Sequence, residues 1–277
     1  MSDSIIKPFC PPLGLRILRK LDFPHKIGII ERLYGKALEK QGTVWTTTAN
    51  DVLWKLDLGD NLHRWMLYSD YEGSYFGKWA RQWLYRGGLV IDSGANIGQA
   101  LVYVAPFSGV RILAFEPLPE AVAWLKECLE LQRGWDVEVI NKGIFKTNTI
   151  LTLRIHGPRS TLRMDWYAGQ AFETTTVEVV SLDSFLTNRN EQRVRLWMLN
   201  VEGAEMDALE GAEQYLSRQA VDALYLHIGA KNYKAGIAYL EPKGYKIFTF
   251  GKNSLLKAPS EMTSTTNILA IADPFLK

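Results

Sequence analysis

The sequence of 277 residues predicts an α/β fold, with a mostly parallel sheet covered by helices on both faces. From residue 88 onward, apolar runs of strand length alternate with stretches of helical spacing. The stretch LVIDSGANIGQA, residues 89–100, joins such a strand to a helix through a turn with two glycines. Two late apolar runs, YKIFTF and NILAIA, have no helix between them and should pair antiparallel.

The N-terminal segment predicts an appendage to this fold. Residues 1–42 place apolar residues at helical spacing among many charges, interrupted by Pro24, which predicts two short amphipathic helices. Residues 43–58 alternate around the turn-like AND and predict a β-hairpin. The predicted domains are a helical and hairpin appendage, residues 1–64, and a main domain, residues 65–277.

The two predicted appendage helices are basic. Their cations are Arg16, Arg19, Lys20, Lys26, Arg32, Lys36 and Lys40. A basic amphipathic face can contact a membrane surface or an acidic partner. The alternative, which the sequence favours, is a solvated face on helices that pack over the core.

The main domain alternates strand and helix. The predicted strands are GLVIDSG, VRILAFEP, DVEVINKG, VRLWMLN, VDALYLHI, YKIFTF and NILAIA. The predicted helices are IGQALVYVAPF, PEAVAWLKECLELQ, AEMDALEGAEQYL and KNYKAGIAYLEPKG, preceded by one from the aromatic segment 63–85. Residues 149–185 predict a β excursion whose polar tip, residues 156–173, is a place for substrate contacts. On this tip we expect His156 at the surface, and Trp166 and Tyr167 are more typical of packing than of a substrate platform.

Composition limits the classes of function. A net charge of +2 with 22% charged residues gives no strong field, so nucleic acid is not an expected partner. Cys10 and Cys128 lie far apart and predict neither a disulfide nor a metal site. No window approaches the roughly 20 apolar residues that span a bilayer, which makes the cytoplasm the default expectation. A homodimer stays open.

Ligands of open α/β sheets bind at the carboxyl ends of the strands. The residues there are Asp92, Gly94, Ala95, Asn96 and Gly98 after the first strand, Glu116 and Pro117 after the second, Asn141 and Gly143 after the third, Asn200, Glu202 and Glu205 after the fourth, and His227 at the fifth. Glu116 can accept both hydroxyls of a ribose. The dinucleotide pattern G-x-G-x-x-G is absent, and Asp92 would repel a pyrophosphate but suits an ammonium or sulfonium group.

The motifs VIDSGANIG, AFEP, VVSLDSF and NVEGAEMDALEGA occur in this order over roughly residues 65–250. In these motifs the sequence resembles the FkbM-type S-adenosylmethionine-dependent methyltransferases. The resemblance implies a class I methyltransferase (Rossmann-like) fold with a seven-stranded sheet whose last strand is antiparallel. It also implies S-adenosylmethionine as cofactor and O-methylation of a hydroxyl on a sugar, a glycan or a secondary metabolite.

The resemblance also assigns residues. It implies that Asp92, Gly94, Asn96 and Gly98 hold the methionine end of the cofactor, that Glu116 holds the ribose, and that Asn141 and Gly143 surround the adenine. Asn200 departs from the aspartate usual in the family's DVEGAE pattern, so a bound Mg²⁺ is not expected. No structural metal is expected either.

A hydroxyl acceptor must lose its proton, so a general base is expected near the strand ends. The candidates are His227, Glu202 and Glu205. His227 is favoured because an ordinary histidine pKa of about 6.5 leaves it partly neutral at physiological pH, although it could also be a core histidine. Both glutamates lie at a helix start, which favours their charged form, and Asn200 can orient a hydroxyl but cannot take its proton. Two alternatives remain: a cofactor-binding fold without methyl transfer, and a less favoured nicotinamide-dependent oxidoreductase.

Overall fold

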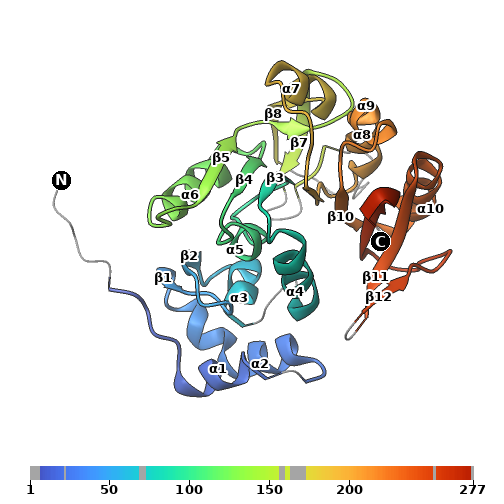
Figure 1. Cartoon of the computed structure of the whole chain (residues 1–277). Helices are drawn as coiled ribbons and strands as arrows, with labels where there is room; N and C mark the ends of the chain where they lie inside the picture. The colour runs from blue at the N-terminus through green and yellow to red at the C-terminus, as the bar shows by residue number, and fades with distance from the viewer. Residues whose placement is uncertain are drawn as a thin grey trace.

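The computed structural model describes residues 7–21, 23–68, 73–155, 160–162, 173–251 and 254–275 (Figure 1). Most of the predicted excursion tip lies outside these residues, together with His156, Trp166 and Tyr167. The described part of the excursion consists of its two long strands and residues 160–162.

Within these described ranges, eight strands form the central sheet. Their order is β12 (Leu255–Lys257), β11 (Tyr245–Phe250), β13 (Thr266–Ala272), β10 (Ala223–Ile228), β9 (Leu196–Leu199), β3 (Gly88–Ser93), β4 (Val110–Phe115) and β5 (Asp136–Ile140). The strands from β10 to β5 pair in parallel, whereas β13 is antiparallel to both β10 and β11. The predicted α/β fold is confirmed, and β12 adds an edge strand by pairing antiparallel with β11.

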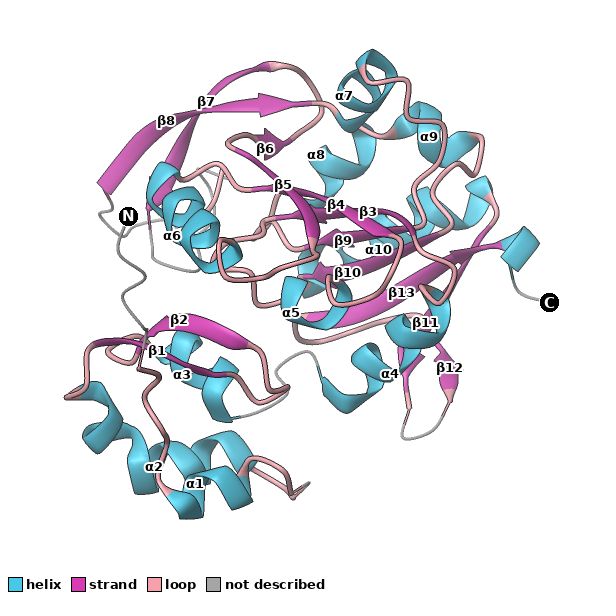
Figure 2. Cartoon of the chain, turned by 60° about the vertical axis from the view of Figure 1, so that its left-hand side comes forward, coloured by secondary structure: helices cyan, strands magenta, loops and turns pink. Residues whose placement is uncertain are grey.

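Helices cover both faces of this sheet (Figure 2). They are α3 (Asn61–Tyr68), α4 (Gly73–Trp83), α5 (Leu101–Val104), α6 (Pro119–Leu129), α7 (Leu182–Asn188), α8 (Glu205–Glu210), α9 (Glu213–Ser217) and α10 (Ala230–Leu240), with short 3₁₀ turns η1 (Glu241–Lys243) and η2 (Asp273–Phe275). Successive strand residues serve opposite cores: Val90 packs with residues of α3 to α6, and Ile91 with residues of α7 to α10. Covered faces on both sides explain why these strands read as unbroken apolar runs.

The appendage contains α1 (Leu13–Leu18), α2 (Lys26–Glu39) and the antiparallel hairpin of β1 (Thr43–Thr47) and β2 (Leu53–Asp57). The two predicted helices and the predicted hairpin are thus confirmed. In both views α1 and α2 form the layer farthest from the central sheet (Figures 1 and 2). The domain boundary between residues 64 and 65 stays a prediction.

Three predicted helices differ from the structure. The helix after β3 is only the short α5, because left-handed residues at Asn96 and Gly98 delay its start and Pro106 follows its end. The segment 63–85 supplies two helices, α3 and α4, instead of one. The helix predicted after β9 is broken at Gly211, where a Cβ would lie 2.1 Å from the Phe145 carbonyl oxygen. Gly211, the last glycine of the motif NVEGAEMDALEGA, is required by this close approach of two chain segments.

The excursion between β5 and β9 forms a separate sheet of β6 (Gly143–Ile144), β8 (Glu173–Val180) and β7 (Thr149–Ile155), in that order among the described residues. Strands β7 and β8 pair antiparallel from Thr149 to Ile155, as a β excursion requires. Its end, VVSLDSF, is not all strand: Ser181 caps α7, and its hydroxyl accepts the Ser184 N–H.

Candidate active site

A glycine turn, residues 94–98, connects β3 to α5 at the carboxyl end of the sheet. Gly94 has a φ of +83°, and a Cβ there would lie 1.9 Å from the Asn200 carbonyl oxygen, just past the end of β9. The N–H groups of Gly94 and Ala95 donate to the Phe115 carbonyl at the end of β4. The turn is therefore wedged between the neighbouring strands, and only glycine fits at its start.

Gly98 is constrained by a different neighbour, the hairpin of the appendage. A Cβ at Gly98 would lie 2.6 Å from the fully buried Trp54 ring of β2. The Trp54 indole N–H donates to the Ile97 carbonyl at 2.7 Å. The Asn50 side-chain amide, at the hairpin tip, donates to the Val102 carbonyl of α5 at 2.6 Å. The second glycine is thus explained by hairpin packing, a contact that local sequence patterns do not reveal.

Glu116, at the end of β4, is only 6% exposed. One carboxylate oxygen accepts the Asn96 N–H and the other accepts the Leu118 N–H, each at 2.9 Å. Burial raises the pKa of Glu116 to about 7, and these two hydrogen bonds oppose the rise. Backbone donors hold the carboxylate in place, and each oxygen keeps capacity to accept a further hydrogen bond.

Glu116 lines a cavity at the carboxyl ends of the strands, hereafter the first cavity. The other lining residues are Gly94, Asn96, Gln99, Pro117, Leu118, Gly143, Ile144, Leu153, Ser160, Leu162, Asn200, Val201 and Glu202. The structure thus brings together predicted site residues from four strand ends. It adds Leu153 and Leu162 from the excursion and Gln99 from the start of the helical stretch. Gln99 directly follows Gly98, the second glycine of the turn, and this position in the sequence could have indicated that Gln99 lies at the site.

Asn141 is not among the described residues that line either cavity discussed here. Its side-chain amide donates to the carbonyls of Glu116 and Pro117, at 3.0 and 2.9 Å. Asn141 therefore fixes the backbone that carries the carboxylate, while its neighbour Gly143 lines the first cavity.

A second cavity adjoins the first on the β10 side of the glycine turn. Its lining residues are Asp92, Gly94, Ala95, Gln99, Ala100, Met198, Leu199, Asn200, Tyr225, His227 and Asn267. Gly94, Gln99 and Asn200 line both cavities. The Gln99 Oε1 and Asn200 Oδ1 atoms are buried, and among the described residues neither has a hydrogen-bond partner. Two carboxamide oxygens thus stand ready to accept from a ligand at the junction of the cavities.

His227 enters the second cavity from β10. Its Nδ1 atom lies 2.7 Å from the Oδ1 atom of Asn267, its direct partner in the antiparallel pairing of β10 with β13. Because an amide oxygen can only accept, Nδ1 carries the proton and Nε2 is left as an acceptor in the neutral ring. Sequence reasoning missed Asn267, since strand pairing alone brings it beside His227.

The two glutamates of the NVEGAE motif have separate surroundings. Glu205 is 2% exposed, and its oxygens accept the Gly203 N–H at 2.7 Å and the Asn232 amide at 2.6 Å. It lies outside the described lining of both cavities, whereas Glu202 lines the first. Glu202 has a left-handed φ of +44°, and its carbonyl accepts the Thr161 hydroxyl at 2.6 Å. Glu205 therefore stabilises the loop before α8, and Glu202 is the glutamate at the site.

These residues fit S-adenosylmethionine. Glu116 presents a backbone-held carboxylate where a ribose needs two acceptors. At the junction of the cavities, the Gln99 and Asn200 oxygens lack partners among the described residues and match the donors of an ammonium group. Asp92, 4% exposed on the wall of the second cavity, is an acidic residue of the kind that suits a sulfonium group.

Comparison with known proteins identifies the family of the chain. The model of the methyltransferase FkbM domain matches residues 92–248, more than half of the chain. Methyltransferase 1 of Beauveria bassiana (strain ARSEF 2860) is 28% identical over 146 residues, 45% of this chain and 58% of that protein. The chain thus spans somewhat more than half the length of this curated relative.

Solved structures also align with the chain. A SAM-dependent methyltransferase from Agrobacterium tumefaciens aligns with a TM-score of 0.47 and 11% identity over 83% of this chain and 70% of its own. An rRNA methylase from Streptococcus thermophilus aligns with a TM-score of 0.44 and 14% identity over 71% of this chain and 93% of its own. The family match covers the glycine turn, Glu116 and His227, and the chain belongs to the FkbM family of S-adenosylmethionine-dependent methyltransferases.

Proposed function

We propose that this protein transfers a methyl group from S-adenosylmethionine to the oxygen of a hydroxyl on a sugar, a glycan or a secondary metabolite. The observation that carries the proposal is the His227–Asn267 pair in the second cavity, directly beside the first cavity that suits the cofactor. A histidine held with an unprotonated nitrogen is the base that a hydroxyl acceptor needs.

The first cavity is proposed to hold the adenosine part of the cofactor. Glu116 accepts both ribose hydroxyls, and the aliphatic side chains of Ile144, Leu153 and Leu162 pack around the adenine near Gly143. At the junction of the cavities, the Gln99 and Asn200 oxygens accept from the ammonium group, with Asp92 nearby. Bound there, S-adenosylmethionine supplies an electrophilic methyl group.

The second cavity is proposed to hold the acceptor. Asn267 Oδ1 accepts the Nδ1 proton of His227, so Nε2 takes the proton of the acceptor hydroxyl as its oxygen attacks. Asn200 orients the hydroxyl by a hydrogen bond without taking its proton. Positioning of acceptor and donor supplies much of the rate.

Glu202 is the second candidate for the base, because it lines the first cavity. Glu205 is a poorer candidate, since both its oxygens already accept hydrogen bonds within the protein. In our proposal both glutamates have supporting roles.

One alternative function has an observation in its favour. Asn200 stands where the family usually has aspartate, which is compatible with a fold that binds the cofactor without transferring its methyl group.

Two measurements separate the proposed methyl transfer from this alternative. Calorimetry with S-adenosylmethionine and with NAD tests the cofactor, and release of S-adenosylhomocysteine over a panel of sugars, glycans, phenols and RNA tests transfer. Turnover with a hydroxyl compound that requires His227 supports the proposal. Cofactor binding without turnover on any acceptor supports the alternative, and methylation of RNA alone contradicts the proposed acceptor.

A further inference from the structure

Charge is distributed unevenly along the chain. Residues 1–42 contain eight Lys and Arg and four Asp and Glu, a net charge of +4, whereas the whole chain carries +2. The other residues therefore sum to −2. The excess of positive charge belongs to the segment that forms α1 and α2, the outermost layer in Figures 1 and 2.

Exposed apolar side chains gather on the same two helices. Of the large hydrophobic residues that are exposed in the described part of the chain, five lie between residues 13 and 33 and four are scattered elsewhere. Leu13 and Leu33 are the most exposed of the five, at 68% and 63%. Scattered apolar residues are normal on a protein surface, but a concentration on neighbouring helices indicates an interaction site.

Cations alternate with these apolar residues at helical spacing. On α2, Ile29, Arg32, Leu33 and Lys36 are spaced i, i+3, i+4 and i+7, which places them on one face. On α1 and the turn after it, Leu13, Ile17 and Leu21 also follow a helical spacing and are 68%, 54% and 50% exposed. Lys20 beside them lies 3.9 Å from Asp51 of the hairpin, so the cations named for this face that have no ion pair are those of α2. Among the described residues, no ion pair involves Arg32 or Lys36.

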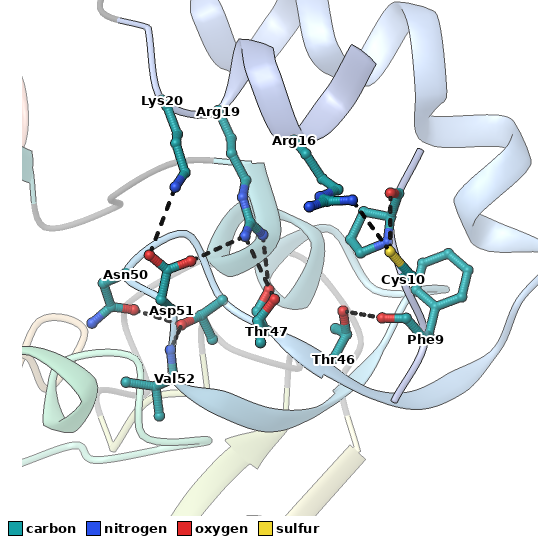
Figure 3. A network of polar contacts seen from close by, with 12 residues as sticks. Phe9, Cys10, Arg16, Arg19, Lys20, Thr46, Thr47, Asn50, Asp51 and Val52 are labelled. Atoms are coloured by element: carbon teal, nitrogen blue, oxygen red, sulfur yellow. Dashed lines mark hydrogen bonds and ion pairs between the residues drawn. The ribbon is translucent and has the colours of Figure 1, made fainter. Parts of the chain in front are cut away.

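The opposite side of this layer is fixed to the protein. In Figure 3, Arg19 reaches down from α1 and donates to the Thr47 carbonyl of the hairpin at 2.9 Å, with Asp51 3.3 Å away. On α2, Ile30 is fully buried, and the Glu31 carboxylate binds the guanidinium of Arg64 on α3. The two helices are thus held in place, and their outer face is formed before any partner arrives.

We propose that the outer face of α1 and α2 docks on a lipid bilayer that contains anionic lipids. Apolar side chains between cations suit the boundary of headgroups and acyl chains, because long basic side chains reach the phosphates while their stems lie along apolar surface. A protein partner fits less well, since aromatic residues are enriched in protein–protein interfaces and none of the residues named above for this face is aromatic.

The test uses the full chain and sedimentation with vesicles of phosphatidylcholine, with or without phosphatidylserine. Wild type should bind only the anionic vesicles, and added salt should weaken binding. Leu33→Ser should weaken binding about tenfold. The double variant Arg32→Gln and Lys36→Gln should weaken it about 25-fold, on the order of fivefold for each cation.

Two matched controls distinguish this face from the rest of the surface. Ile150→Ser removes an equally exposed apolar residue, 66% exposed on β7, and Arg133→Gln with Lys257→Gln removes the same charge elsewhere. Both should bind like wild type, with unchanged melting temperatures in all variants. If Leu33→Ser loses thermal stability, Ile17→Ser, 54% exposed on α1, replaces it. The proposal is overturned if wild type ignores anionic vesicles, if the controls lose as much affinity, or if the face instead mediates a Leu33-dependent dimer.

Discussion

The two cavities beside the glycine turn are built in different ways. In the first, Glu116 is held by backbone N–H groups from its own strand end and from the adjacent turn. In the second, His227 is held by the side chain of Asn267, which follows 40 residues later on a strand of opposite direction. The first cavity therefore follows from short motifs, and the second depends on how distant strands pair. Substitutions of residues that line only one of the cavities should leave the function of the other largely intact.

The largest expected effect comes from the second cavity. His227→Gln removes the proposed base and should lower kcat by about 10²–10⁴-fold while the Kd for S-adenosylmethionine stays within a few-fold. Turnover against pH, with calorimetry of cofactor binding, measures both. Glu202→Gln is the comparison variant. If Glu202→Gln is inactive and His227→Gln keeps near-normal turnover with the same acidic limb, the roles of the two residues are reversed.

The reciprocal substitution lies in the first cavity. Glu116→Ala removes the two charge-assisted hydrogen bonds that we propose it makes to the ribose, about 2–4 kcal/mol, and should weaken cofactor binding roughly 30-fold or more. Turnover at saturating cofactor should fall much less. Calorimetry checks the affinity, with Glu120→Ala, an exposed glutamate of α6, as the control. Unchanged affinity in Glu116→Ala would contradict the assignment of the ribose to this residue.

Asn267 tests how far side-chain positioning matters. Asn267→Ala removes the acceptor for Nδ1–H and should lower kcat about tenfold, because one hydrogen bond is worth about 1–1.5 kcal/mol. Asn267→Asp keeps an acceptor for Nδ1–H and should keep the ring orientation, so it should restore most of the turnover that Asn267→Ala loses. Equal losses of kcat in Asn267→Ala and Asn267→Asp would show that the hydrogen bond to His227 does not position the ring.

The smallest expected effect is a pH dependence confined to the first cavity. Burial raises the pKa of Glu116 to about 7, so the carboxyl is mainly protonated at pH 6 and mainly ionised at pH 8. In our proposal the ionised form accepts both ribose hydroxyls, so affinity should rise with pH, at most about tenfold between these values. Adenosine is the probe, because it has the ribose but no amino acid group to titrate. Glu116→Gln should bind adenosine with no such dependence, and a wild-type affinity that falls with pH would contradict the argument.

The same carboxyl affects stability with the opposite sign. Its pKa in the folded protein lies above its usual value of 4.5, so the folded state holds the proton more tightly than the unfolded state. Its contribution to the free energy of unfolding is present below about pH 4.5 and is lost as pH rises through about 7. Without ligand, the melting temperature of Glu116→Gln relative to wild type should therefore increase from pH 5 to pH 8. A constant difference would indicate an ordinary pKa.

The sequence predicted the succession of strands and helices along the chain. It also predicted most of the first cavity, because Gly94, Asn96 and Glu116 act within or next to their own segments. It did not predict that Trp54 packs against Gly98, that Asn141 is used by backbone carbonyls, or that Asn267 holds His227. Each of these contacts joins residues that are 24 or more positions apart. The predicted length of a helix was wrong where another chain segment approaches it closely, as at Gly211.

The position of β13 bears on how the protein is synthesised. This strand leaves the ribosome after β11 and β12, yet it lies between β10 and β11, so β10 has no neighbour on that side until β13 emerges. A nascent chain can form the parallel half of the sheet, with Glu116 and the glycine turn, while the β10 edge is still unpaired. Such long-range insertion is slow and exposes a strand edge in the meantime. A chain stalled on the ribosome with the residues up to about 250 outside the exit tunnel should therefore bind adenosine. Methyl transfer should require the full-length chain, in which β13 is present.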